Sequence, residues 1–193
     1  MKNFALVLIV AAVVASAQPP LFATAAPPPP VHAAARVQPD VAILAREAAA
    51  IVSGRLKVTG VKFFAAGGTT ANGQKTSSAA GITEWSFLFN IDQSQGSSYG
   101  SARIDYIKGK FKAVVTNAYP YVGGDTMTPI PAMRFARAVQ LLRAAGHHDR
   151  ILLVELRFPL YPGVTEPEYM FNFGGAKPEI TVGTKTGKVK VIK

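Results

Sequence analysis

Residues 169–191 read YMFNFGGAKPEITVGTKTGKVKV. The aromatic side chains of Tyr169, Phe171 and Phe173 recur at every second position, which is the pattern of a half-buried β-strand. Ile180 and Val182 continue this alternation, and the chain closes with Lys185-Thr186-Gly187-Lys188-Val189, where glycine suits a hairpin turn that needs a positive φ. The segment therefore predicts an aromatic strand followed by the last strands of an antiparallel sheet.

A helix is expected upstream of this segment, over residues 131–146. The apolar residues Ala132, Phe135, Val139 and Leu142 form one stripe at helical spacing, Pro131 suits the first turn, and Gly146 ends the pattern. A further strand is predicted over residues 151–158. Residues 131–193 are therefore predicted to form one helix packed on a three- to four-stranded antiparallel sheet.

Residues 40–114 repeat this order in a looser form. The expected elements are a helix capped by Asp40, a long polar loop at 66–82, an aromatic strand at Trp85, Phe87 and Phe89, and a final strand at 109–114. Residues 115–130 read as a connector rich in Pro, Gly and Tyr. The predicted fold class is α+β, with two tandem units of this kind. One unit alone has a marginal core, and the sequence leaves open whether the two sheets join.

The first 17 residues have the pattern of a signal peptide. Lys2 gives a basic start, Phe4 to Ala15 form an apolar run, and Ala15-Ser16-Ala17 supplies a small-x-small cleavage pattern. The run is shorter than the ~20 apolar residues of a membrane span, although an uncleaved N-terminal anchor is the alternative. Residues 18–39 read as a Pro/Ala-rich tether. The protein is thus predicted to be periplasmic or secreted, with no transmembrane span after signal cleavage.

The composition limits the chemistry and suggests partners. The chain contains no cysteine, which excludes a disulfide scaffold, a thiolate metal site and a cysteine nucleophile. Its formal net charge of +10 at pH 7 favours anionic neighbours such as acidic proteins, lipid head groups or cell-wall polymers. A role of this charge in solubility alone is the alternative. Nucleic acid is not expected as a partner of an exported chain.

On the quoted residues, the C-terminal unit resembles the PepSY family. The matching features are the predicted helix 131–146, the Tyr-x-Phe-x-Phe strand at 169–173, and the ending Thr181-Val182 with Lys185-Thr186-Gly187-Lys188-Val189. A tandem pair of such units is similar to the architecture of β-lactamase-inhibitor-like proteins. The long loop 66–82 and the lack of Thr-Gly before Lys110 depart from the family pattern. The resemblance implies a non-catalytic role in protease propeptides, protease inhibition or envelope signalling.

Three groups of residues invite a reading as reactive sites, and none fits well. Lys185-Thr186-Gly187 matches one motif of penicillin-recognising serine enzymes, but the chain has neither Ser-x-x-Lys nor Ser-Asp-Asn. His147-His148-Asp149 offers diverging side chains, whereas a zinc site needs three or four ligands, and His32 lies in the tether. Glu166 and Glu168 flank Pro167 and read as a solvated pair. No catalytic residue, metal or cofactor is therefore expected.

Two sets of residues are candidates for partner binding. Tyr119, Tyr121 and Tyr161 lie in Pro/Gly-rich segments, where rigid aromatic side chains suit protein recognition, unless they pack under the loops as lids to the core. Lys108, Lys110 and Lys112 alternate on a predicted strand, where lysines either contact an anionic surface or only discourage pairing of sheet edges.

These observations predict an exported, non-catalytic binding protein of the cell envelope. Its expected partner is an envelope protein or peptide, with inhibition or regulation of a hydrolase as one form of that role and an anionic surface as a further partner. The alternative is a periplasmic small-molecule or lipid carrier with a cavity between helix and aromatic sheet.

Overall fold

The computed structural model describes residues 40–192. The predicted signal peptide, residues 1–17, and the predicted tether, residues 18–39, lie outside the described residues. The described elements are α1 (Val41–Leu56), β1 (Val61–Thr69), the short 3₁₀ helices η1 (Ala79–Gly81) and η2 (Gln93–Gln95), β2 (Glu84–Ile91), β3 (Ser101–Ile107), β4 (Lys110–Asn117), α2 (Phe135–Ala144), β5 (Leu153–Arg157), β6 (Glu168–Asn172), β7 (Glu179–Gly183) and β8 (Val189–Ile192).

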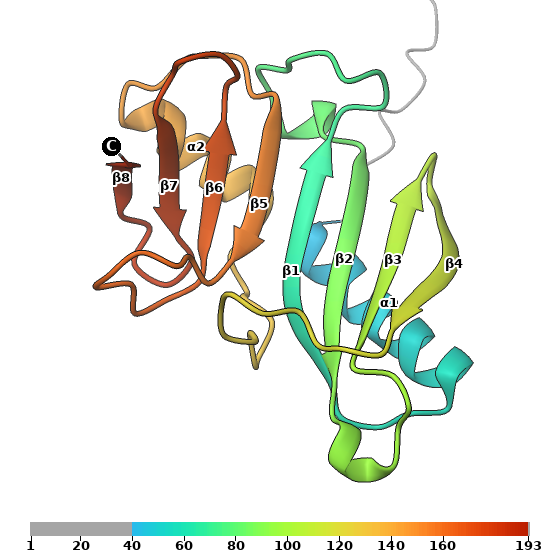
Figure 1. Ribbon diagram of the computed structural model, residues 1–193. Coiled ribbons are helices and arrows are strands. Elements are labelled where there is room, and N and C mark those ends of the chain that lie inside the picture. The colour runs from blue at the N-terminus through green and yellow to red at the C-terminus, as the bar shows by residue number, and fades with distance from the viewer. Residues whose placement is uncertain (1–39, 193) are drawn as a thin grey trace, which may run out of the picture. The chain divides into compact units, whose positions relative to one another are not determined.

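All eight strands belong to one antiparallel sheet with the order β4-β3-β2-β1-β5-β6-β7-β8 (Figure 1). The prediction of an α+β fold with two tandem helix-on-sheet units is therefore wrong. The two predicted units are joined at the centre of the sheet, where Ala65–Thr69 of β1 pair with Leu153–Arg157 of β5. Separate sheets would leave the backbone N–H and C=O groups of both strands unpaired at exposed edges, and pairing them removes these edges.

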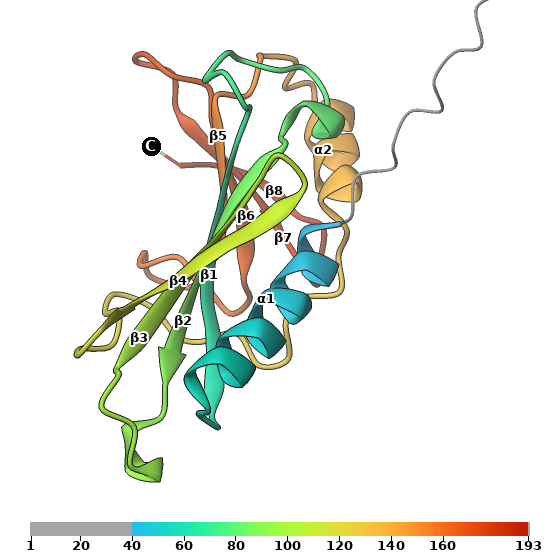
Figure 2. The ribbon, with the colours of Figure 1, turned by 90° about the vertical axis from the view of Figure 1, so that its right-hand side faces the viewer.

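Both helices lie on the same face of the sheet, and this face carries the core (Figure 2). The α1 helix begins as predicted at Asp40, whose carboxylate accepts a hydrogen bond of 3.0 Å from the backbone N–H of Ala42. It buries Val41, Leu44, Ala48 and Val52. The α2 helix begins at Phe135 rather than Pro131, and buries Phe135, Ala138, Val139 and Leu142.

The predicted aromatic rows lie on β2 and β6, except that Phe173 follows the end of β6. The rings of Phe87, Phe89, Tyr169 and Phe171 are fully buried. The Phe135 ring joins the two halves of the core, with its centroid 5.4 Å from that of Trp85, 5.7 Å from Tyr169 and 6.1 Å from Phe171. These rings fill the space between the helices and the aromatic strands, where a small-molecule or lipid carrier was predicted to have its cavity. Among residues 40–192, no helix is long and apolar enough to cross a membrane.

The loop predicted at 66–82 is shorter than expected, because β1 continues through Gly67 and Gly68 to Thr69. The loop that follows is tied to the second half of the chain. Thr76 and Ile151 exchange two backbone hydrogen bonds, of 2.7 and 2.8 Å. This extension of β1 places two glycines in a central strand of the sheet.

Candidate binding site on the uncovered sheet face

The sheet face opposite the helices is defined by alternation, because Trp85, Phe87 and Phe89 point to the core and their neighbours point away. Strand register then sets side chains of four strands side by side. One row contains Glu155, Gly67, Ser86 and Asp105, and the next contains Arg157, Ala65, Leu88 and Arg103. The two central strands, β1 and β2, thus present mostly small side chains, and the strands beside them present long charged ones.

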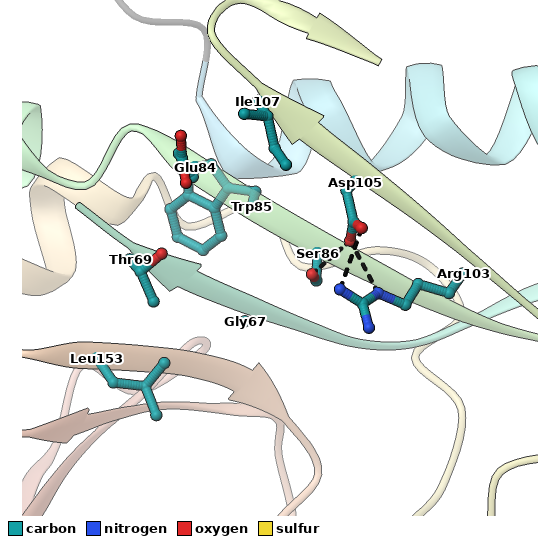
Figure 3. A pocket seen from close by; sticks show the side chains of 9 residues that line it. All are labelled: Gly67, Thr69, Glu84, Trp85, Ser86, Arg103, Asp105, Ile107 and Leu153. Carbon is teal, nitrogen blue, oxygen red and sulfur yellow. Dashed lines mark hydrogen bonds and ion pairs between the residues drawn. The ribbon is translucent and has the colours of Figure 1, made fainter. Parts of the chain in front are cut away.

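A hollow of about 290 Å³ lies over the small side chains (Figure 3). Its lining is Gly67, Thr69, Glu84, Trp85, Ser86, Arg103, Asp105, Ile107 and Leu153, and we call it the Gly67 trough. A Cβ atom built on Gly67 would have no heavy atom within 4 Å, so the space above this residue is open. A Cβ on the neighbouring Gly68 would lie 2.7 Å from a ring carbon of Trp85. The two glycines therefore differ: Gly68 is required by packing, whereas Gly67 is not.

Four charged side chains beside the trough form two ion pairs. Arg103 donates two hydrogen bonds to Asp105, of 2.8 and 3.0 Å, and Ser86 donates one of 2.5 Å. The hydrogen bond to Asp105 raises the pKa of Arg103. On the other side, Arg157 and Glu155 form an ion pair of 3.1 Å. These pairs fix the shape of the wall beside the trough, whereas the carboxylate of Glu84, which also lines it, belongs to neither pair.

A buried polar cluster lies further along the same face, where β6, β7 and β8 meet. Glu168 is fully buried and accepts hydrogen bonds from the Tyr161 hydroxyl and from the Lys190 ammonium, the latter at 2.7 Å. Burial and the bond to Glu168 raise the pKa of Tyr161 to about 12. Tyr161 therefore anchors the loop 158–167 to the sheet. Tyr161 is half-buried, and its role in partner contact stays a prediction.

Glu166 is also buried, so the prediction of a solvated Glu166–Glu168 pair is wrong. Its carboxylate accepts hydrogen bonds from the Thr186 hydroxyl at 2.5 Å, from the Thr186 N–H at 3.0 Å and from the Lys185 N–H. Burial raises the pKa of Glu166, but these hydrogen bonds outweigh burial and hold it below the ordinary value. The carboxylate thus fixes the β7–β8 turn.

The connector crosses the uncovered face and carries the other two predicted tyrosines. Tyr121 stacks on Phe64 with ring centroids 5.6 Å apart, and its backbone exchanges hydrogen bonds of 2.7 and 3.0 Å with the Asn90 side chain. Tyr119 is 81% exposed. Two further apolar residues that the sequence did not single out, Val122 and Leu160, are 86% and 65% exposed. Tyr119 is therefore available for contact, whereas Tyr121 is half-buried.

The three predicted lysines lie in or beside β4 at one edge of the sheet. Lys108 is in the two-residue turn before β4, with φ of 53°, and Lys110 pairs with Ile107. Lys112 lies at the register shift of β4, and its carbonyl accepts a hydrogen bond of 3.0 Å from Arg55. The register shift and the hydrogen bond both obstruct pairing of another strand here. None of the three lysines lines the Gly67 trough.

The residues considered for metal binding do not converge. Within residues 40–192, no group of three or more His, Cys, Asp or Glu side chains is placed to hold a metal ion. Arg143 donates hydrogen bonds to the backbone carbonyls of His147 (2.6 Å) and Asp149 (2.8 Å). The Asp149 side chain pairs with Lys177, and this hydrogen bond lowers the pKa of Asp149.

No protein-family model matches the chain, and neither does any curated protein. Among solved structures, the chain is similar to the crystal structure of a candidate lipoprotein from Clostridium difficile 630. The two share 11% sequence identity with a TM-score of 0.45, over 76% of this chain and 90% of that chain. The PepSY resemblance stays a prediction.

Proposed function

We propose that the chain is an exported, non-catalytic binding protein of the cell envelope, and that it recognises a protein partner through the Gly67 trough. The observation that carries this proposal is the open space above Gly67 on the helix-free face of the sheet. A partner side chain that enters this space would contact Ser86 and Leu153 and lie beside the Arg103–Asp105 pair. The signal-peptide pattern of residues 1–17 supports the envelope location.

A protein fits this face better than a small ligand. The trough is open above Gly67, and the connector and the loop after β5 leave further apolar side chains exposed, those of Tyr119, Val122 and Leu160. Protein interfaces combine a central pocket with aromatic and aliphatic contacts, and bury ~800 Å² on each partner. The paired charges of the trough supply fixed hydrogen-bonding groups that need no rearrangement when a partner binds.

The test is capture of a partner from the native envelope by the mature chain and by two variants. Gly67→Phe fills the trough without meeting a neighbouring atom at its Cβ. Gly54→Phe is the matched control, because Gly54 lies on α1, is exposed and also has no atom within 4 Å of a built Cβ. We expect the wild type and Gly54→Phe to retain the same stoichiometric protein, and Gly67→Phe to lose it while its circular dichroism spectrum stays native. Equal capture by all three proteins would refute the trough as the binding site.

A further inference from the structure

A second hollow, of about 450 Å³, lies at the end of the sheet where the connector meets the loops after β5 and β7. Its lining includes the apolar side chains of Met127, Ile130, Pro131, Phe158 and Pro167, together with Lys185. We call it the Lys185 pocket. Its volume falls in the range of ~300–1,000 Å³ that is usual for small-molecule sites, and such sites combine apolar walls with a few polar groups.

The walls of this pocket are held by hydrogen bonds on each side. The Met127 N–H donates to the Phe63 carbonyl at 2.7 Å, which fixes the connector against β1. The Thr184 N–H and hydroxyl both donate to the Pro167 carbonyl, at 2.9 and 2.8 Å. A ligand would therefore meet a preformed cavity and would order little of the chain on binding.

The positive charge at the pocket lacks a counter-charge. The Lys185 side chain is exposed and forms no ion pair within residues 40–192. The adjacent turn packs on α2, since a Cβ built on Gly187 would lie 3.2 Å from Leu141. The carboxylate next to Pro167, that of Glu166, is engaged by Thr186 and the turn backbone.

We propose that the Lys185 pocket binds an amphiphile with a single acyl chain and an anionic head group. The chain lies among the apolar side chains of the connector and the loop, and the head group contacts the Lys185 ammonium. An apolar cavity with an unpaired cation at its lining is complementary to this class of ligand in both parts. This site is separate from the Gly67 trough and does not depend on the function proposed for it.

The probe is decanoate in monomeric solution, measured by titration calorimetry against the mature chain. Decanol lacks the charge and acetate lacks the chain, and both should bind at least about tenfold more weakly, as expected for loss of a charged hydrogen bond or of buried methylene groups. Added salt should weaken decanoate binding because the head-group contact is exposed.

Two variants place the site, and each has a matched control. Ala132→Trp, at an exposed lining position, should fill the pocket and abolish binding, whereas Ala136→Trp, exposed on α2 outside the lining, should bind as wild type. Lys185→Met keeps the apolar stem and should weaken binding roughly tenfold, whereas Lys188→Met should not. Gly67→Phe should bind decanoate normally, so failure of this site and failure of the trough are distinguishable.

Three results would overturn the proposal. The first is a folded wild-type chain that does not bind decanoate. If such a chain instead sediments only with anionic phospholipid vesicles, its ligand is a membrane surface and not a molecule in the pocket. The second is equal affinity for decanol, which would remove the role of Lys185. The third is unaltered decanoate binding by Ala132→Trp.

Discussion

Adjacent glycines in β1 allow a sharp test of the uncovered face, because Gly67 and Gly68 point to opposite sides of the sheet. Each is replaced by valine, a residue favoured in strands. At Gly67 the new Cβ meets no atom within 4 Å, and neither glycine has a positive φ that would strain a side chain. At Gly68 the Cβ would lie 2.7 Å from Trp85 and 2.8 Å from Ile82.

The magnitudes follow from these two environments. Glycine in a strand costs roughly 0.5–1 kcal/mol relative to alanine, and β-propensities span ~1 kcal/mol, so Gly67→Val should raise the free energy of unfolding by about 1 kcal/mol. Overpacking a filled core costs ~1–3 kcal/mol, so Gly68→Val should lower it by about that amount. The two variants should thus differ by roughly 2–4 kcal/mol.

The measurement is urea denaturation followed by tryptophan fluorescence, since Trp85 is the single tryptophan of the chain. The difference between the variants corresponds to roughly 4–16 °C in Tm for a domain of this size. A Gly67→Val protein as unstable as Gly68→Val would show that the space above Gly67 is filled, and the reasoning about the trough would fail. The same measurement made on Gly67→Phe tests whether this binding variant leaves the fold intact.

Three further predictions concern the buried polar groups beside the loop 158–167. Glu168→Gln leaves the Lys190 ammonium without its counter-charge and should lower the free energy of unfolding by about 1–3 kcal/mol; an unchanged urea midpoint would contradict this. Burial raises the pKa of Glu166, but the hydrogen bonds to its carboxylate hold this pKa below the ordinary 4.5. The ionised carboxylate therefore stabilises the fold fully above pH 4.5, and this stabilisation is lost as the pH falls through the lower pKa of the folded state. The wild type should therefore lose more stability on acidification than Glu166→Gln, and parallel stability curves would disprove the role of this carboxylate. Because the pKa of Tyr161 is raised to about 12, ultraviolet titration of the wild type should contain a step near that pH which Tyr161→Phe lacks; coincident titration curves would rule out the hydrogen bond to Glu168 in solution.

Local patterns predicted the parts of the fold that depend on local physics. The alternation of Trp85, Phe87 and Phe89 places these rings on one face of β2, and all three are buried. The Asp40 carboxylate caps α1 because the first backbone N–H groups of any helix need acceptors. Gly187 adopts the expected positive φ, 69°, in the last turn. Each of these features is decided within a few neighbouring residues.

The errors concern contacts between distant segments. The pairing of β1 with β5 joins residues 65–69 to 153–157, and no local pattern specifies which strand edges meet. Gly67 and Gly68 suggested a loop because glycine is a poor strand former, yet Trp85 requires one of them in a strand. Glu168 looked solvated beside Pro167, and its burial depends on Tyr161 and on Lys190, which is 22 residues away.

The candidate site was missed for a related reason. The alternation in β2 places Ser86 away from the core, but the trough appears only when register sets Ser86 beside Gly67. Of the predicted contact residues, Tyr119 is exposed near the same face, Tyr161 is committed to Glu168, and the three lysines lie at the β4 edge. The sequence therefore predicted recognition through loops, whereas the proposed site lies on the sheet.

The position of Gly67 is the strongest argument that the uncovered face has a function. A glycine in a central strand lowers stability by roughly 0.5–1 kcal/mol, out of a total that is usually ~5–15 kcal/mol. For Gly68 this loss is offset by the close packing of Trp85, but nothing within 4 Å requires a glycine at Gly67. The open space above Gly67 therefore supports the proposal that a partner enters it.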